Sequence, residues 1–376
     1  MSANTSVLEV NSRAQLKEFI RFPAELYRDD PNFVCPLESE RLEFFDKEKN
    51  PFYSGARTKL FLAQRGTETV GRIATCVYFA HNELHHDKVG FFGFFDCIND
   101  KEVAHALLKV ALITLKTEGM TAMRGPASFT LNHECGLLVD GFDSPPVVMM
   151  TYNQPWLVPL VESFGLEKVM DLYAFLITDE APFPERVLRL TEKIAKRSAV
   201  TIRKMNMKRF DEEVRIINDI YNQAWEDNWG FVPMTTEEFE FTAKNLKQVV
   251  DPDLALVAEV DGKAVAFSLS LPDINQALIH LDGKLLPFGI LKLLWHTKVR
   301  SKIDGVRTVT MGVIPAYRKR GIDTLLYVKT YLDGTAKGYK WSELSWALET
   351  NTLLHSLVEG IGAHRYKTYR MYEMPI

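Results

Sequence analysis

Apolar and polar residues alternate in two matched hairpins, one in each half of the chain. Residues 59–79, KLFLAQRGTETVGRIATCVYF, contain two apolar runs around a glycine turn, a pattern that predicts two antiparallel strands. Residues 254–271, LALVAEVDGKAVAFSLSL, repeat the pattern, with Asp261-Gly262 as the tight turn. We therefore expect each half to be built around a β-hairpin.

Helical and strand periodicities surround each hairpin in the same order. For the second half we expect helices at 211–226, 235–249, 321–337 and 352–360 and strands at 306–314, 341–347 and 364–373. For the first half we expect strands at 88–98, 121–128 and 168–177 and helices at 101–118 and 154–164. The predicted fold class is α/β, in which each half has a mixed, mostly antiparallel sheet flanked by helices.

Two landmarks repeat along the chain with almost the same offset. Gly66, in the turn of the first hairpin, precedes Gly262 by 196 residues. Gly165 ends the stretch LVESFG and precedes Gly362, which ends LVEGIG, by 197 residues. Because two different landmarks share one spacing, we expect two tandem copies of one fold.

The length and composition agree with two folded domains. The chain has 376 residues, enough for about two domains, and we place them at 1–180 and 185–376. The join, TDEAPFPERV (178–187), carries the prolines and acidic residues of an exposed linker. Lys+Arg number 45 and Asp+Glu 49, a net charge of −4, which excludes the dense basic surface that broad nucleic-acid binding requires.

Neither a disulfide framework nor a metal site is expected. The four cysteines lie at least 21 residues apart and never approach a CxxC spacing; they are Cys35, Cys76, Cys97 and Cys135. Three histidines, His81, His85 and His86, lack a clear ligand set. This cysteine usage fits a reducing compartment, and no secretion-signal pattern opens the chain, so we expect a cytoplasmic protein.

The most apolar short runs, 89–98 and 285–295, are shorter than the ~20 residues that a membrane-spanning helix needs. The second, LLPFGILKLLW, has basic neighbours at Lys284, Lys292, Lys298 and Arg300. Its composition allows contact with a fatty chain or with the inner face of a membrane, and the alternative is buried core.

The segment 311–326, MGVIPAYRKRGIDTLL, carries the strongest chemical signal. An apolar strand ends at Pro315, and three basic residues, 318–320, precede Gly321, where a helix begins. Backbone N–H groups at a helix N-terminus lack partners and lie at the positive end of the helix dipole. The pattern predicts a phosphate or diphosphate site, and the alternative is a solvated basic loop.

This segment resembles the acyl-CoA-binding motif of the GNAT acyltransferase superfamily, Arg/Gln-x-x-Gly-x-Gly/Ala between the fourth strand and the third helix. Arg318 and Gly321 match, whereas Asp323 stands where the family has Gly or Ala, which places an acidic side chain near the pyrophosphate. Residues 342–363, SELSWALETNTLLHSLVEGIGA, resemble the second motif, in which Asn351 follows the fifth strand. In element order, the resemblance covers the whole second copy.

The resemblance implies acyl-CoA as a co-substrate and no permanently bound cofactor. Backbone groups of Gly312 and Val313 match the family position that holds the pantetheine and polarises the thioester carbonyl. The other CoA-binding residues that it implies are Arg318, Lys319, Arg320, Gly321, Ile322, Asp323, Thr324 and Asn351.

The first copy lacks this loop. Residues 91–108 have no Arg-x-x-Gly and instead place Asp96, Asp100 and Glu102 where phosphates would lie, so we expect the first copy not to bind CoA. A degenerate copy before a competent one is similar to the tandem GNAT architecture of protein N-myristoyltransferases, Fem-type aminoacyl-transferases and N-acyl amino acid synthases. In those relatives the substrate groove lies largely between the copies.

In the reaction that the resemblance implies, an amine attacks the thioester directly. The family's frequent tyrosine acid falls at Val358, which leaves Tyr366, Tyr369 and Tyr372 as substitutes. Candidate bases are Glu343, Glu349, Glu226 and Asp227 in the second copy and the pair His133–Glu134 in the first. A structural or solvated role is the alternative for each.

The expected function is acyl-CoA-dependent N-acyl transfer to an amine such as an amino acid or a sphingoid base. The two-copy architecture and the apolar run at 285–295 favour a long acyl chain over acetyl. Bacterial ceramide synthases are one GNAT-like candidate of this size. The alternatives are a non-catalytic acyl-CoA-binding protein and a nucleotide-processing enzyme, although GxxxxGK[ST] is absent.

Overall fold

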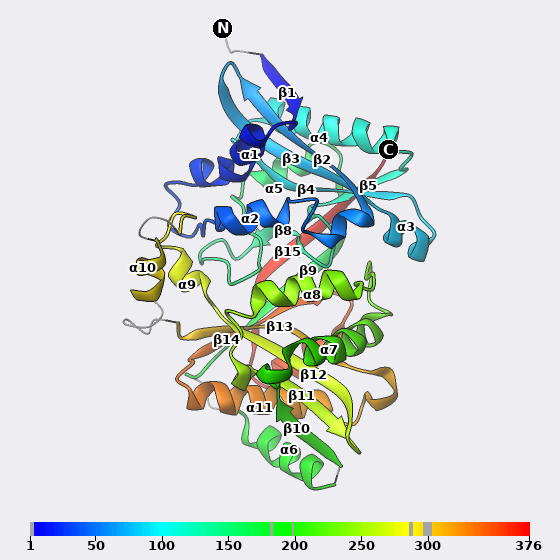
Figure 1. Cartoon of the computed structure of the whole chain (residues 1–376), viewed down its shortest axis with the longest axis vertical. Helices are drawn as coiled ribbons and strands as arrows, with labels where there is room; N and C mark the ends of the chain where they lie inside the picture. The colour runs from blue at the N-terminus through cyan, green and yellow to red at the C-terminus, as the bar shows by residue number, and fades with distance from the viewer. Residues whose placement is uncertain (1–3, 181–182, 198, 286–288, 296–302) are drawn as a thin grey trace. The chain divides into compact units, whose positions relative to one another are not determined.

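A computed structural model describes residues 4–180, 183–197, 199–285, 289–295 and 303–376 (Figure 1). The chain divides into two compact units. The first unit comprises Met1–Leu172, Ala277–Trp295 and Lys367–Ile376. The second unit comprises Tyr173–Gln276 and His296–Tyr366.

The first unit is built on one sheet with the strand order β1-β2-β3-β4-β5-β15-β9, in which β8 also pairs with β15. Its strands are β1 (Thr5–Glu9), β2 (Ala56–Arg65), β3 (Glu68–Tyr78), β4 (Val89–Cys97), β5 (Ala122–Gly125), β8 (Leu137–Asp140), β9 (Glu167–Thr178) and β15 (His364–Pro375). A separate ribbon pairs β6 (Ala127–Ser128) with β7 (Glu134–Cys135). Its helices are α1 (Arg13–Leu26), α2 (Glu38–Phe44), α3 (Phe79–His85), α4 (Lys101–Thr117), α5 (Leu157–Glu162) and α10 (Gly289–Leu294).

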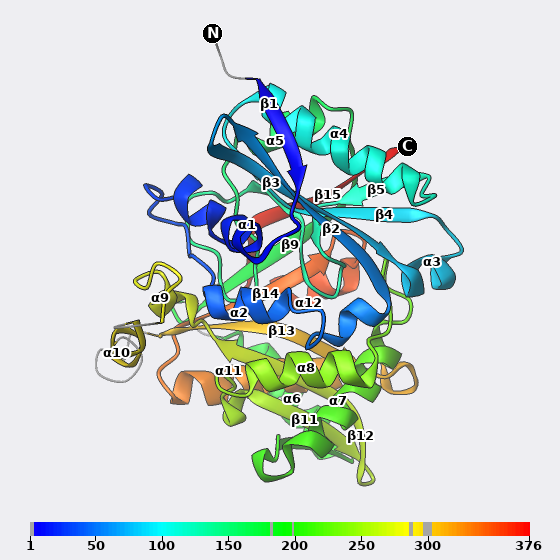
Figure 2. The ribbon, with the colours of Figure 1, turned by 45° about the horizontal axis from the view of Figure 1, so that its top comes forward.

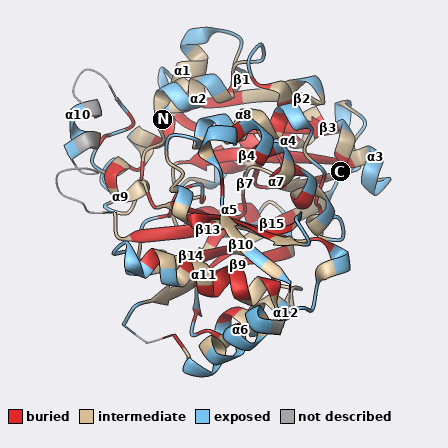
Figure 3. Cartoon of the chain, turned by 60° about the horizontal axis from the view of Figure 1, so that its bottom comes forward, coloured by how far each residue is buried: buried red, intermediate tan, exposed pale blue. Residues whose placement is uncertain are grey.

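Helix α4 supplies one side of the first unit's core because its apolar residues recur on one face. Val103, Leu107, Ala111 and Leu115 are at most 1% exposed and pack with residues of β2, β3 and β4. Figure 3 shows strands of the sheet as buried and α6 of the second unit as largely exposed. The apolar stripe thus fixes which face of α4 meets the sheet.

The second unit repeats the architecture with the strand order β9-β14-β13-β12-β11-β10. Its strands are β10 (Val200–Lys204), β11 (Ala255–Val260), β12 (Lys263–Pro272), β13 (Gly305–Val313) and β14 (Trp341–Leu348), with the ends of β9 and β15. Its helices are α6 (Glu185–Arg197), α7 (Phe210–Trp225), α8 (Thr236–Leu246), α11 (Ile322–Ala336) and α12 (Thr352–Gly360). The short helix α9 (Asn275–Leu278) begins in this unit.

Two helices approach β13 from its two faces. Gly312 faces α7, since a Cβ there would lie 2.8 Å from the Cβ of Ala224. Met311 packs in the cluster that contains Tyr327 of α11. Successive residues of a strand point to opposite faces, so α7 and α11 enclose the sheet between them, as the views in Figures 1 and 2 allow the reader to follow.

The predicted repeat is confirmed, with the same element order in both halves. Gly66 and Gly262 adopt positive φ angles of 62° and 76° in the two hairpin turns. Gly165 and Gly362 also have positive φ, 106° and 102°, after α5 and α12. These four landmarks therefore mark positions where both copies require a left-handed backbone.

Most of the expected helices and strands occur with ends shifted by a few residues, and at 154–164 α5 covers only Leu157–Glu162. The single strand expected at 121–128 is wrong, because the segment is divided into β5 and β6, and β6 pairs with β7 in a separate ribbon. Thr235 caps α8 with a full capping box: its hydroxyl accepts a hydrogen bond from the Glu238 N–H, and the Glu238 carboxylate accepts one from the Thr235 N–H. Several elements were not expected from the pattern, namely β1, α1, α2, α6 and β10.

The compact units differ from the expected division at 1–180 and 185–376 in three segments. Tyr173–Glu180 belong to the second unit, whereas 277–295 and Lys367–Ile376 belong to the first. Two of these differences arise because β9 and β15 are long strands, each with residues in both units.

Within the described residues, no helix combines the length and apolar character needed to span a bilayer. The apolar run at 285–295 forms α10 in its described part, where Leu291 is 64% and Trp295 52% exposed. The buried-core alternative is therefore wrong for these two side chains. Pro287, Lys298 and Arg300 lie outside the described residues.

Candidate functional site

Strands β13 and β14 separate part-way along their length. They pair in parallel from Gly305 opposite Trp341 to Thr308 opposite Leu344. Beyond this point β13 continues to Val313 and β14 to Leu348 without further pairing between them. Peptide groups on this edge of β13 are available to an extended ligand, as in the addition of a strand to a sheet.

A β-bulge marks the place where the strands separate. On β12, Leu269 pairs with Thr310 and Ser270 with Thr308, which leaves Val309 as an extra residue of β13. A bulge increases the local twist and redirects the strand that carries it. The bulge therefore gives a physical reason for the separation of β13 from β14.

A glycine is required at position 312 because helix α7 packs closely against strand β13 there. An added Cβ would meet Ala224 at 2.8 Å and Phe267 at 3.2 Å, which is closer than normal packing allows. Val313 follows it and accepts a hydrogen bond from Arg318 Nε at 3.3 Å. The two residues whose backbone was expected to hold pantetheine thus lie on the separated part of β13.

The expected basic loop joins β13 to α11. After a short 3₁₀ helix, Pro315–Tyr317, Arg318 donates from Nη2 to the backbone carbonyl of Ala224 at 2.7 Å and so connects the loop to α7. Arg320 donates to the carbonyl of Ala316 and lies over the Tyr317 ring at 4.6 Å. Lys319, also exposed, has no ion pair with any described residue.

The two copies differ sharply in the N-caps of their equivalent helices. Gly321 begins α11 at a φ of 76° and offers no capping side chain. Asp100 begins α4, and its carboxylate accepts hydrogen bonds from the N–H groups of Glu102 and Val103. A carboxylate therefore already occupies the amides of α4, whereas the start of α11 keeps the character of an anion site.

The acidic residues of the first copy have internal partners. Asp96 is buried and pairs with Arg72 at 2.7 Å, and Tyr27 donates a hydrogen bond to it at 2.7 Å. Asp100 pairs with Arg65 at 2.8 Å. The hydrogen bond that the Arg65 side chain donates is the largest cause that lowers the pKa of Asp100. These carboxylates therefore have structural partners within the first unit, and that they exclude phosphate stays a prediction.

Asp323, the departure from the GNAT motif, accepts a hydrogen bond from the N–H of Thr324 at 2.8 Å. Its carboxylate thus takes up one amide of the first turn. Burial, followed by the charge of Asp323, raises the pKa of Tyr327, one turn further along α11. Ile322 is buried and anchors this turn in the core.

Glu343 is the centre of a buried polar network on β14. Its side chain is fully buried, and both carboxylate oxygens accept hydrogen bonds, Oε1 from the hydroxyl of Ser345 and Oε2 from that of Tyr366. Arg307 donates to Ser345 Oγ at 2.9 Å and lies 3.9 Å from Glu343 Oε1. Tyr366 is half-buried, so its hydroxyl connects the buried carboxylate with a more accessible side chain.

Other candidates in the second unit lie outside this network. Glu349 is half-buried in the turn after β14, and Asn351 caps α12 by accepting a hydrogen bond from the N–H of Leu354 at 3.2 Å. Glu226 and Asp227 are exposed beyond the end of α7, and Asp227 lies 3.7 Å from Arg318.

Three expected catalytic residues belong to the first unit. Tyr369 is fully buried on β15, opposite Leu138 of β8. Glu134 forms a bidentate ion pair with Arg41, at 2.6 and 2.9 Å. His133 is hydrogen-bonded to Thr130 and not to Arg41, so the two adjacent residues have different partners.

His133 packs edge-on against Phe44 and Phe52, with ring centroids 5.4 and 5.0 Å apart. Its Nδ1 is hydrogen-bonded to the hydroxyl of Thr130 at 3.0 Å. Burial, with a smaller effect of Arg41, lowers the pKa of His133 to about 4. The imidazole is therefore neutral at pH 7.

Some residues near the separated strands were not predicted from the sequence. Arg307 and Ser345 belong to the Glu343 network, and their polar character inside apolar strands was the available signal. Trp225 and Trp346 lie with ring centroids 6.4 Å apart. No local pattern connects these two rings, since they come from α7 and β14.

Comparison with known proteins gives full-length relatives, although no protein-family model matches the chain. Protein YghO of Escherichia coli (strain K12) is 39% identical over 373 residues, covering 97% of this chain and 94% of that protein. The bacterial ceramide synthase of Caulobacter vibrioides is 38% identical over 377 residues, covering 99% of this chain and 98% of that protein.

Solved structures share the fold at low sequence identity. A tandem GNAT protein from the clavulanic acid biosynthesis pathway superposes with a TM-score of 0.59 at 9% identity, over 99% of this chain and 98% of that one. A GCN5-related N-acetyltransferase from Sphaerobacter thermophilus gives 0.55 at 14% identity, over 99% and 95%. The predicted tandem GNAT fold is thereby confirmed.

Proposed function

The chain belongs to the family of bacterial ceramide synthase, and we propose that it transfers a long-chain acyl group from acyl-CoA to the amine of a sphingoid base. An acyl-CoA-dependent N-acyltransferase agrees with both the family and the tandem GNAT fold. The single structural observation that carries the proposal is the uncapped start of α11 beside three basic residues, next to the opening between β13 and β14.

Acyl-CoA would bind in the second unit. Its diphosphate would accept hydrogen bonds from backbone N–H groups at Gly321 and Ile322, with Lys319 as the neighbouring cation that has no competing ion pair among the described residues. The pantetheine would extend along Gly312 and Val313, where β13 no longer pairs with β14. Asn351 is a cap of α12, so its proposed contact with the ligand would come from its backbone or its amide nitrogen.

The thioester carbonyl would lie where β13 and β14 separate. The amine nitrogen attacks the carbonyl carbon, a C–N bond forms, and the C–S bond then breaks to release CoA. Backbone N–H groups of β13 beyond the bulge would stabilise the negative charge on the carbonyl oxygen. Fixed donors at this position cost no reorganisation during the reaction.

The attacking amine must also lose a proton. We assign this task to the Glu343 carboxylate, reached through the hydroxyl of Tyr366, which already donates to Glu343 Oε2. A proton accepted at the Tyr366 oxygen would pass along this bond to Glu343, which lies 3.9 Å from Arg307. Tyr366 is one of the three tyrosines expected as substitutes, and we choose it because its hydroxyl is hydrogen-bonded to Glu343.

The acceptor is proposed from the family, with support from the site. A sphingoid base has a long alkyl chain, and aromatic rings gather on the α7 side of β13. Tyr221, Trp225, Phe231 and Trp346 lie in a chain of ring contacts with centroids 5.2 to 6.4 Å apart. Such rings supply a large apolar surface for a lipid acceptor.

The test is incubation of the purified chain with palmitoyl-CoA and sphinganine. We expect free CoA, measured by a thiol reagent, and N-palmitoyl sphinganine, identified by mass spectrometry, in equal amounts. Glu343→Gln should lower kcat by about 10²–10⁴-fold and change the KM for palmitoyl-CoA much less. Binding of palmitoyl-CoA with the thioester intact across a panel of amines would instead indicate a non-catalytic acyl-CoA-binding protein.

A further inference from the structure

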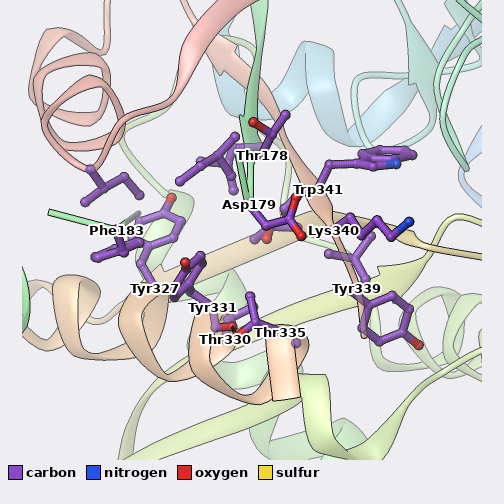
Figure 4. A pocket seen from close by; sticks show the side chains of 17 residues that line it. Thr178, Asp179, Phe183, Tyr327, Thr330, Tyr331, Thr335, Tyr339, Lys340 and Trp341 are labelled. Atoms are coloured by element: carbon purple, nitrogen blue, oxygen red, sulfur yellow. Dashed lines mark hydrogen bonds between the residues drawn. The ribbon is translucent and has the colours of Figure 1, made fainter. Parts of the chain in front are cut away.

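A cavity of about 50 Å³ lies inside the second unit, on the α11 side of the sheet. Figure 4 shows the side chains of Tyr327, Tyr331 and Thr330 from α11 facing this space, with Phe183 on one side and Trp341 on the other. None of the residues assigned above to CoA, to the proton relay or to the aromatic acceptor surface lines it. The cavity therefore needs an explanation of its own.

The cavity begins where β13 and β14 separate. Thr308 and Leu344, the last paired residues of the two strands, both line it. Val306 and Ser342 continue the wall along the paired part of the strands, away from the proposed thioester position. Thr308 and Leu344 therefore lie between the cavity and the opening proposed for the thioester.

One continuous apolar cluster connects the separated part of β13 with the cavity. Met311, three residues beyond the last pair, packs against the cluster that contains Tyr327, Leu344 and Phe183. These three residues also line the cavity. Met311 lies five positions after Val306, roughly 16 Å along a strand, a length that a long acyl chain spans and an acetyl group does not.

We propose that this cavity receives the methyl end of the long acyl chain of acyl-CoA and thereby determines the preference for chain length. The proposal rests on the acyltransferase function given above. A cavity of about 50 Å³ has room for only a few groups of the size of a water molecule, each of which needs about 10–15 Å³ of such volume, so the cavity accepts only the end of the chain. The rest of the chain lies along the cluster from Met311 to Leu344.

The first test fills the cavity. Thr330→Phe adds a ring from α11 into it, and we expect the ratio of kcat/KM for palmitoyl-CoA over octanoyl-CoA to fall about tenfold. Leu332→Phe adds bulk on the same helix but on its exposed side, since Leu332 is 48% exposed, and should leave this ratio at the wild-type value. An unchanged ratio in folded Thr330→Phe would overturn the proposal.

A second test requires no turnover and uses Trp341 as a reporter. In 16-bromohexadecanoyl-CoA the bromine marks the end of the chain, and it should quench tryptophan emission more in the wild type than in Trp341→Phe. In 2-bromohexadecanoyl-CoA the bromine lies beside the thioester, and its quenching should not depend on Trp341. Equal quenching of both proteins by the 16-bromo compound would place the chain end elsewhere.

The two failures are distinguishable. If no acyl-CoA is consumed with sphinganine while quenching by the 16-bromo compound depends on Trp341, the proposed reaction is wrong and the cavity assignment stands. If N-palmitoyl sphinganine forms while the quenching is independent of Trp341, the cavity assignment is wrong and the reaction stands.

Discussion

Arg307 and Glu343 form a buried pair across two parallel strands, with the guanidinium Nε 3.9 Å from Oε1 and side chains 4% and 0% exposed. Removal of one member would leave a buried charge without its counter-charge. We expect Arg307→Met to lower the free energy of unfolding by about 3–5 kcal/mol. Urea unfolding followed by circular dichroism measures this loss.

The double variant Arg307→Met/Glu343→Gln provides the control for this pair. Because it removes both charges, it should recover part of the stability lost in Arg307→Met, with a coupling energy of about 0.5–3 kcal/mol. If the stability lost in the double variant equals the sum of the losses in Arg307→Met and Glu343→Gln, the two side chains do not interact.

Lys319 and Lys101 test the difference between the two copies. Lys319 precedes the uncapped start of α11, whereas Lys101 follows the capping carboxylate of Asp100 at the start of α4. Lys319→Glu should raise the KM for palmitoyl-CoA about tenfold or more, equivalent to about 1.4 kcal/mol of binding free energy. Lys101→Glu, a matched charge reversal, should leave this KM unchanged.

Steady-state kinetics at several palmitoyl-CoA concentrations separate the two outcomes. Added salt should weaken CoA binding in the wild type more than in Lys319→Glu, because the variant has lost one attractive charge. Equal effects of the two substitutions on KM would remove the basis for assigning CoA to the second unit.

His133 makes stability depend on pH. Its pKa is lowered from the ordinary 6.5 to about 4 in the folded protein, first by burial and then by Arg41. Protonation therefore favours the unfolded chain, and the stability that neutral His133 provides is complete above pH 6.5 and declines as the pH falls toward 4. His81, with a pKa also lowered to about 4, adds to the same decline.

The measurement compares urea unfolding at pH 7.5 and pH 5.0. The wild type should lose stability between these values, and His133→Gln should lose less, because one of the histidines with a lowered pKa is gone. A His133→Gln variant with the full pH dependence of the wild type would show that this imidazole titrates normally.

Thr330 carries a buried hydroxyl that has no hydrogen-bond partner among the described residues, and the residue is 7% exposed. Thr330→Val removes this hydroxyl and retains the shape of the side chain. We expect the free energy of unfolding to rise by about 1 kcal/mol, since an unsatisfied buried polar group is costly. Thermal unfolding gives the result, and a lower melting temperature would mean that the hydroxyl has a partner in solution.

Local patterns were sufficient to predict most of the second unit. The helices and strands around Gly262 and Gly321 follow from apolar periodicity and from glycines at turns and helix ends, all of which are short-range properties of the sequence. The basic loop was placed correctly for the same reason. Whether it binds CoA remains a prediction.

The network around Glu343 could be predicted only in part. Glu343 itself was a candidate, but its partners depend on which residues of β13 and β15 come to lie beside β14. A choice between Tyr366 and Tyr369 depends on the register of β15 against its neighbouring strands. Such pairings are determined by the whole fold, and no local pattern encodes them.

Asp100 shows the same limit in the first unit. Its charge suggested repulsion of phosphate, and the structure shows in addition that it caps α4 and pairs with Arg65. The Asp100 carboxylate therefore accepts hydrogen bonds from the N–H groups at the start of α4. A charge count alone does not distinguish these two effects.

The last ten residues, Lys367–Ile376, complete the sheet of the first unit, where Tyr372 pairs with Gly125 and Met374 with Met123. Domains usually fold in the order of their synthesis on the ribosome. Here the half that is translated first lacks a central strand of its sheet until Lys367–Ile376 have been synthesised. A chain truncated before Lys367 would therefore lack this strand in its first unit, although every residue of Met1–Leu172 would be present.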